Sequence, residues 1–158
     1  MTEQERLDSL KAALGGDILE IAAPARRRIF LTVDRTKIAA VLTALRDKLG
    51  MTYIDTITGL DTGETYEILY HMAEPAYGNV NVRIKIPKAD PHVASITPVL
   101  PGAIYYEREL QDMFGLVIDG IPDPRPLITS DDWPANNYPL RKDWKFERPA
   151  EIIPGGKK

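Results

Sequence analysis

Apolar residues recur every three or four positions in two stretches of the N-terminal half, which predicts two amphipathic helices. In the first stretch, Leu7, Leu10 and Leu14 share one helical face. Thr2 and Glu5 precede that face with the three-residue spacing of a capping box. The first helix should therefore begin close to residue 2 and end before the glycine pair that follows Leu14.

The second helix is the clearest element of the sequence. Asp34 is a suitable N-cap, and Gly50 is a suitable stop because glycine tolerates the left-handed conformation that ends helices. Between them the apolar residues form a single stripe: Ile38, Val41, Leu42, Leu45 and Leu49. A stripe of this kind needs an apolar partner, so we expect it to be buried against a sheet.

Five apolar runs predict the strands of that sheet, at 18–22, 29–33, 51–59, 65–71 and 80–86. In the last run, apolar and polar residues alternate with a period of two, as in a strand with one buried face. The order helix, two strands, helix, three strands is typical of an α+β fold, in which an antiparallel sheet packs against helices. We expect residues 1–90 to fold alone in this way.

Prolines interrupt the pattern after residue 87, and one further helix is predicted at 103–114, ended by Gly115. From residue 122 onward prolines exclude a regular helix or sheet interior, yet the segment carries large apolar side chains: Leu127, Ile128, Trp133, Tyr138, Leu140, Trp144 and Phe146. We therefore divide the chain into an α+β domain over 1–120 and an extended docking tail over 121–158. The tail lies either on its own domain or on a partner, and its length favours a partner. In the isolated chain it should be irregular and leave some of these side chains partly exposed.

Composition excludes several classes of function. The chain has 158 residues, a net charge of -3 and no cysteine, which excludes disulfides, iron–sulfur ligation and a cysteine nucleophile. Two histidines are too few for a histidine-rich metal site, and no phosphate-binding glycine loop is present. No segment is basic enough to follow a nucleic acid, and no apolar run reaches the ~20 residues of a membrane span. We expect a chain without a cofactor, with no secretory signal and with no direct membrane insertion.

The helix predicted at 103–114 carries a dense cluster of charge. Its carboxylates Glu107, Glu109 and Asp112 could serve as general acid and base in a stand-alone enzyme, provided that they converge on one pocket. The simpler interpretation is a helix whose charges pair with one another, since Arg108 and Asp112 are four residues apart. The residues alone favour the second interpretation.

The run from Glu107 to Leu116 resembles the signature of the 30-kDa subunit family of respiratory complex I, and the motif continues at 119–123, 125–128, 131–133 and 138–144. Two positions differ: Ile121 stands where that family often has histidine, and Pro126 stands where it often has arginine. At both positions the sequence is more similar to the related subunit of energy-converting nickel–iron hydrogenases or formate hydrogenlyases. The residues expected at the interface are Glu107, Arg108, Glu109, Asp112, Phe114, Gly115, Gly120, Pro122, Arg125, Asp132, Trp133, Pro139, Leu140, Arg141, Lys142 and Asp143.

The resemblance implies a non-catalytic, peripheral-arm subunit of an NADH:quinone oxidoreductase. Such a subunit packs on the large, 49-kDa-type subunit beside the small iron–sulfur subunit, at the cytoplasmic side of the membrane. The iron–sulfur clusters and the flavin or nickel–iron centre would belong to those partners, and this chain would hold none. A hydrogenase or formate hydrogenlyase subunit, the carboxylate enzyme and a binding module for an unrelated protein stay open as alternatives.

Overall fold

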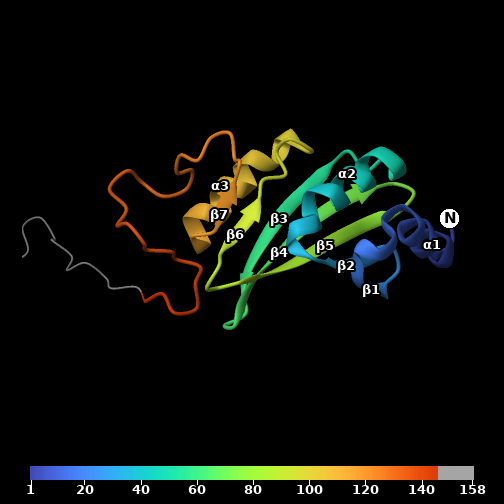
Figure 1. Ribbon diagram of the computed structural model, residues 1–158, viewed down its shortest axis with the longest axis horizontal. Coiled ribbons are helices and arrows are strands. Elements are labelled where there is room, and N and C mark those ends of the chain that lie inside the picture. The colour runs from blue at the N-terminus through green and yellow to red at the C-terminus, as the bar shows by residue number, and fades with distance from the viewer. Residues whose placement is uncertain (146–158) are drawn as a thin grey trace, which may run out of the picture.

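The computed structural model describes residues 1–145, so the expectations for Phe146 and the remainder of the tail lie outside the described residues. Figure 1 shows a twisted sheet with helices against it and a long C-terminal segment at one end. The helices and strands, in chain order, are α1 (Glu3–Leu14), β1 (Ile18–Ala25), β2 (Arg28–Val33), α2 (Ile38–Leu49), β3 (Ile54–Asp61), β4 (Thr65–Glu74), β5 (Gly78–Pro87), β6 (His92–Ala94), α3 (Ile104–Phe114) and β7 (Val117–Asp119).

Five strands form the main sheet in the order β1-β2-β5-β4-β3. Three of its four strand pairs are antiparallel, whereas β2 and β5 run parallel. The α+β fold expected from the sequence is confirmed, and the expectation of an antiparallel sheet holds except at this central pair. Alternation predicts which residues face inward, but it says nothing about the direction of the neighbouring strand, so the parallel pair could not be foreseen.

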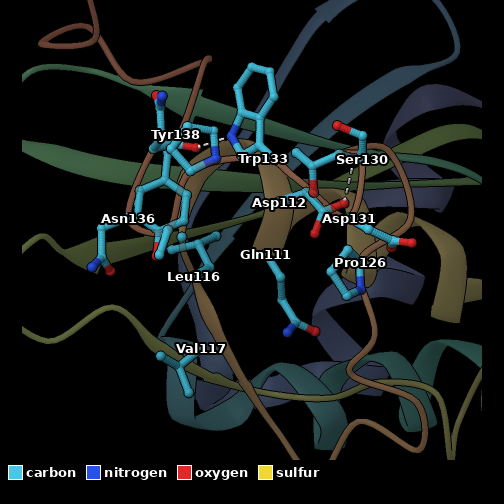
Figure 2. A pocket seen from close by; sticks show the side chains of 15 residues that line it. Gln111, Asp112, Leu116, Val117, Pro126, Ser130, Asp131, Trp133, Asn136 and Tyr138 are labelled. Carbon is cyan, nitrogen blue, oxygen red and sulfur yellow. Dashed lines mark hydrogen bonds between the residues drawn. The ribbon is translucent and has the colours of Figure 1, made fainter.

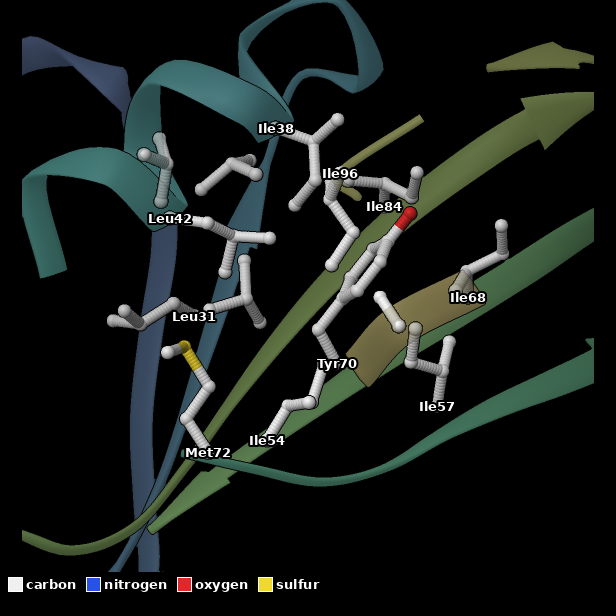
Figure 3. Close-up of a cluster of buried hydrophobic side chains, with 14 of the residues drawn as sticks. Leu31, Ile38, Leu42, Ile54, Ile57, Ile68, Tyr70, Met72, Ile84 and Ile96 are labelled. Atoms are coloured by element: carbon white, nitrogen blue, oxygen red, sulfur yellow. The ribbon is translucent and has the colours of Figure 1, made fainter. Parts of the chain in front are cut away.

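The core lies between the main sheet and its helices, and α2 contributes a complete apolar face to it. Ile38, Val41, Leu42 and Leu45 are all fully buried, as the stripe predicts, and Leu49 packs at its margin. Figure 3 shows Ile38 and Leu42 pointing from α2 toward side chains of the strands. On the sheet, alternate residues of β4 and β5 supply the other half of the core: Tyr66, Ile68, Tyr70 and Met72, then Val80, Val82, Ile84 and Ile86.

The helix ends follow the expected chemistry. The Thr2 hydroxyl accepts from the Glu5 amide, and the Glu5 carboxylate accepts from the Thr2 amide at 2.8 Å, which completes the capping box of α1. Asp34, expected as the N-cap of α2, instead caps the short 3-10 turn before it, where its carboxylate accepts from the Thr36 amide. α2 itself begins at Ile38, and the Lys37 side chain before it makes no capping hydrogen bond. Gly50 ends α2 in the left-handed region, with φ at 70°.

A second, smaller sheet was not predicted. β6, which precedes α3 in the chain, and β7, which follows it, form a parallel pair of three residues each. Strands this short carry no readable alternation, so only their mutual pairing identifies them. α3 packs on β3 at Gly59, where an added Cβ would lie 2.5 Å from a Phe114 ring carbon.

After β7 the described chain contains only turns and bends. We call residues 122–145 the strap. The strap continues past α3 and folds back toward the loop between β3 and β4, where the Asp61 carboxylate accepts from the Lys142 amide. The irregular conformation expected of the tail is confirmed over these residues. Its contact with its own domain is the option that the sequence favoured less.

Candidate functional site

Glu107, in the first turn of α3, is a buried carboxylate with every contact directed into its own domain. One carboxylate oxygen accepts from the Ile96 amide at 2.6 Å, and the other accepts from the hydroxyls of Ser95 and Thr97 at 2.7 and 2.8 Å. The side chain is only 2% exposed. Three donors offset the cost of burying the charge, so Glu107 fastens the segment after β6 to α3.

Arg108 turns outward from the next position and holds the beginning of the strap. Its Nε and Nη2 atoms donate to the carbonyls of Arg125 and Pro126 at 2.7 and 2.8 Å, and Nη1 lies 3.3 Å from the Asp123 carboxylate. Arg125 also binds Asp123, and its hydrogen bond holds the pKa of the Asp123 carboxyl well below its usual range, with Arg108 acting in the same direction. The expected pairing of Arg108 with Asp112 is wrong, because the strap offers each side chain a better-placed partner.

Asp112 binds the strap through backbone amides. One of its oxygens accepts from the amides of Leu127, Ile128 and Thr129 at 2.8, 2.7 and 3.2 Å. A carboxylate that receives three N–H groups fixes the local backbone as a helix cap does. Glu109, on the same helix, is exposed to solvent. The three carboxylates of the enzyme hypothesis therefore point to three different surroundings and do not converge.

The end of α3 is covered by the strap. Gly115 caps the helix with φ at 66°, and an added Cβ would lie 2.4 Å from the Tyr138 ring and 2.5 Å from the Arg141 guanidinium. Arg141 donates to the Phe114 carbonyl at 2.6 Å, and its guanidinium lies 4.1 Å from the Tyr138 ring centre and 5.4 Å from that of Tyr66. Only glycine can both adopt this left-handed conformation and leave room for the Tyr138 ring and the Arg141 guanidinium.

Asp61, at the end of β3, is the residue that sequence reasoning missed. Its side chain is fully buried and accepts from Lys88 Nζ at 2.7 Å, and also from the amides of Gly63 and Lys142, at 2.8 and 2.9 Å. Burial would raise the pKa of Asp61, but these hydrogen bonds outweigh it and lower the pKa to about 2. The sequence marks Asp61 as a turn residue only, and no pattern connects it with Lys142, which lies 81 positions later.

The remaining residues expected at the interface lie on the outer side of the strap or close to it. Trp133 donates from Nε1 to the Asn137 carbonyl at 2.7 Å and remains 38% exposed, and Leu140 is 52% exposed. Trp144 Nε1 donates to the Asn137 side-chain oxygen. The Ser130 hydroxyl donates to the Asp132 carboxylate, whose pKa it lowers. Gly120, Pro122, Lys142 and Asp143 are exposed, and Pro139 is half-buried.

A cavity of about 410 Å³ lies between the C-terminal part of α3 and the strap. Figure 2 shows the labelled side chains around it, with Trp133 and Tyr138 on the strap and Gln111 and Asp112 on the helix. Neither Glu107 nor Glu109 lines this cavity.

Within residues 1–145 no three acidic or histidine side chains gather as metal ligands. In the same part of the chain, no helix is long and apolar enough to span a membrane.

The class of fold is shared with two solved structures. The first is entitled the structure of the membrane-bound sulfane sulfur reductase (MBS), an archaeal respiratory membrane complex. Its matching chain superimposes with a TM-score of 0.73 at 21% identity, over 90% of this chain and 85% of the other. The second, the trypsin-resistant fragment of Nqo5, gives 0.63 at 23% identity, over 75% and 98% of the two chains. At these identities the likeness shows the fold alone.

Sequence similarity assigns the family. Residues 31–150 match the family described as the 30-kDa subunit of respiratory-chain NADH dehydrogenase, and the chain belongs to it. An NADH-quinone oxidoreductase subunit of Nocardioides sp. is 34% identical over 151 residues, covering 89% of this chain and 60% of the relative. Formate hydrogenlyase subunit 5 of Escherichia coli (strain K12) is 32% identical over 145 residues, covering 89% of this chain and 25% of that one. The chain thus spans less than two thirds of the length of these two relatives.

Proposed function

We propose that this chain is a non-catalytic, peripheral-arm subunit of a complex I-like electron-transfer complex. It docks through its strap on the large, 49-kDa-type subunit, beside the small iron–sulfur subunit, and supports assembly. Membership of the 30-kDa subunit family supports this role. The complex would lie at the cytoplasmic side of the membrane, with all redox centres in the partner subunits.

The observation that carries the docking proposal is the two-sided construction of the strap. Its backbone is bound from the inside by Asp112 and Asp61, through the amides of Leu127–Thr129 and Lys142. Its apolar side chains face outward, with Ile128 58% exposed and Leu140 52% exposed. An ordered segment that holds large apolar groups toward solvent loses little conformational freedom when a partner covers them.

A second candidate places the same docking surface in a hydrogenase-type complex. The similarity to formate hydrogenlyase subunit 5 favours it, and so does the presence of Ile121 and Pro126 at the two positions that differ from the complex I signature. The two candidates differ in the catalytic centre of the partners and not in the role of this chain. Identification of the large subunit that co-purifies with the chain distinguishes them.

The test is affinity purification of the full, tagged chain from native membranes. We expect a large hydrogenase-like subunit to co-purify with the wild type, and Leu140→Asp to reduce its recovery strongly because a charge would be buried at the interface. Leu19→Asp is the matched control, since Leu19 is 68% exposed on β1, away from the strap. Equal recovery for all three proteins would contradict docking through the strap.

A further inference from the structure

The cavity beneath the strap has walls that the fold itself holds in place. Asp112 fixes one wall through the amides of residues 127–129. The opposite wall is a turn in which Trp133 donates from its backbone to the Ser130 carbonyl and from its indole to the Asn137 carbonyl. A volume of about 410 Å³ lies within the roughly 300–1,000 Å³ of ordinary binding pockets. The cavity is therefore preorganised and large enough to bind a ligand, which we call the guest.

The lining is acidic and contains no basic side chain. Asp112 and Asp131 both contribute to it, whereas lysine, arginine and histidine are absent from the lining residues. Asp112 already binds three amides, but no residue in the described chain donates to the Asp131 carboxylate or forms an ion pair with it. The charge at Asp131 thus remains available to a cationic guest.

Two further groups suit such a guest. Trp133 presents an indole at the rim, and an indole face attracts a cation more strongly than the other aromatic rings of proteins do. Gln111 contributes a side-chain oxygen that is buried without a hydrogen-bond partner among the described residues. An unmade hydrogen bond of this kind is costly, which makes Gln111 a second acceptor in the wall of the cavity.

We propose that this cavity binds an arginine side chain of a partner subunit. The planar guanidinium can stack on Trp133 while its N–H groups donate to the Asp131 carboxylate at two points, a combination that the compact ammonium of lysine cannot reproduce. The exposed Ile128 and Trp133 continue the cavity into the proposed docking surface. The identity of the donor as a subunit rests on the proposed function, whereas the chemistry of the cavity does not.

The first experiment measures the cavity in the isolated full chain by NMR, with Nα-acetyl-arginine amide as the probe and its neutral citrulline analogue as the comparison. We expect saturable shifts at the Trp133 indole and the Gln111 amide with the arginine probe only. Asp131→Asn should weaken binding by roughly tenfold, because a charge-assisted bidentate contact is lost, and Asp131→Glu should restore much of it. Asp55→Asn removes the same charge from an exposed position on β3 outside the cavity and should bind as the wild type does. No saturable shift in the wild type, or equal binding of citrulline, overturns the proposal.

The second experiment asks whether the guest belongs to a partner. Co-purification from native membranes at increasing salt should show earlier loss of the large subunit for Asp131→Asn than for Asp55→Asn. If Leu140→Asp abolishes co-purification while Asp131→Asn behaves as the wild type, the arginine inference fails and the docking proposal stands. If Leu140→Asp has no effect, docking through the strap fails independently. Binding of the free arginine probe without any effect on co-purification would identify a small guanidinium compound as the ligand and would overturn the assignment to a subunit.

Discussion

At the residue scale, the charged positions of α3 and β3 act as anchors for backbone. Glu107, Asp112 and Asp61 each receive several N–H or O–H donors, and two of the three hold the strap. In the family signature, which can be read as a set of catalytic carboxylates, Glu107 and Asp112 each fix one chain segment on another, whereas Glu109 is exposed. The sequence located Glu107 and Asp112 but missed Asp61, and it identified none of their partners, because a hydrogen bond across 81 positions leaves no local pattern.

The first prediction follows from the pKa of Asp61, which is lowered to about 2 in the folded protein. Because the folded pKa lies below the unfolded value of about 3.9, the carboxylate stabilises the fold fully above that value, and its contribution is lost as pH falls toward about 2. The melting temperature of the wild type should therefore fall more steeply between those pH values than that of Asp61→Asn. Asp55→Asn, an exposed carboxylate of the same strand, is the control, and its curve should follow the wild type. Parallel curves for the wild type and Asp61→Asn would contradict the prediction.

At the element scale, the periodicity of apolar residues predicted the helices and strands that have long apolar faces. The stripe of α2 and the alternation of β5 were visible because each buries one complete face against the core. The parallel pairing of β2 with β5 and the small β6–β7 sheet were not visible. Both depend on which segments meet in space, and a strand of three residues such as His92–Ala94 offers too few positions for a period to emerge.

The second prediction concerns α2. Leu45 is fully buried beneath the helix, so Leu45→Ala removes apolar contacts and leaves a cavity that the surrounding sheet can fill only in part. We expect the free energy of unfolding to fall by about 2–5 kcal/mol, measured by urea denaturation. Leu49→Ala, at the margin of the same stripe, should cost less. A larger loss for Leu49→Ala would mean that the stripe is buried differently from the structure.

At the scale of the whole molecule, the body and the strap are held by different forces. The body is a continuous apolar core between the sheet and its helices, whereas the strap is held mainly by hydrogen bonds, ion pairs and the stacked Arg141. The division of the chain near residue 120 was expected from its prolines and remains a prediction. What the sequence could not supply is the inner contact of the strap with its own domain, because the same aromatic residues suit either an internal or an external partner.

The third prediction tests whether these two parts are separate units of stability. Arg141→Ala removes the guanidinium from the Phe114 carbonyl of α3 and the Tyr66 ring of β4, which are contacts of the strap with the body, and from the Tyr138 ring of the strap itself. Native-state hydrogen exchange should then show faster exchange at the amides of Leu140 and Lys142, while the amides of β4 and β5 keep their protection. Arg125→Ala, whose side chain is 81% exposed, is the control and should leave Leu140 and Lys142 protected. If the β4 and β5 amides lose protection together with the strap, the chain unfolds as one cooperative unit, and removal of residues 122–158 would not leave a folded body.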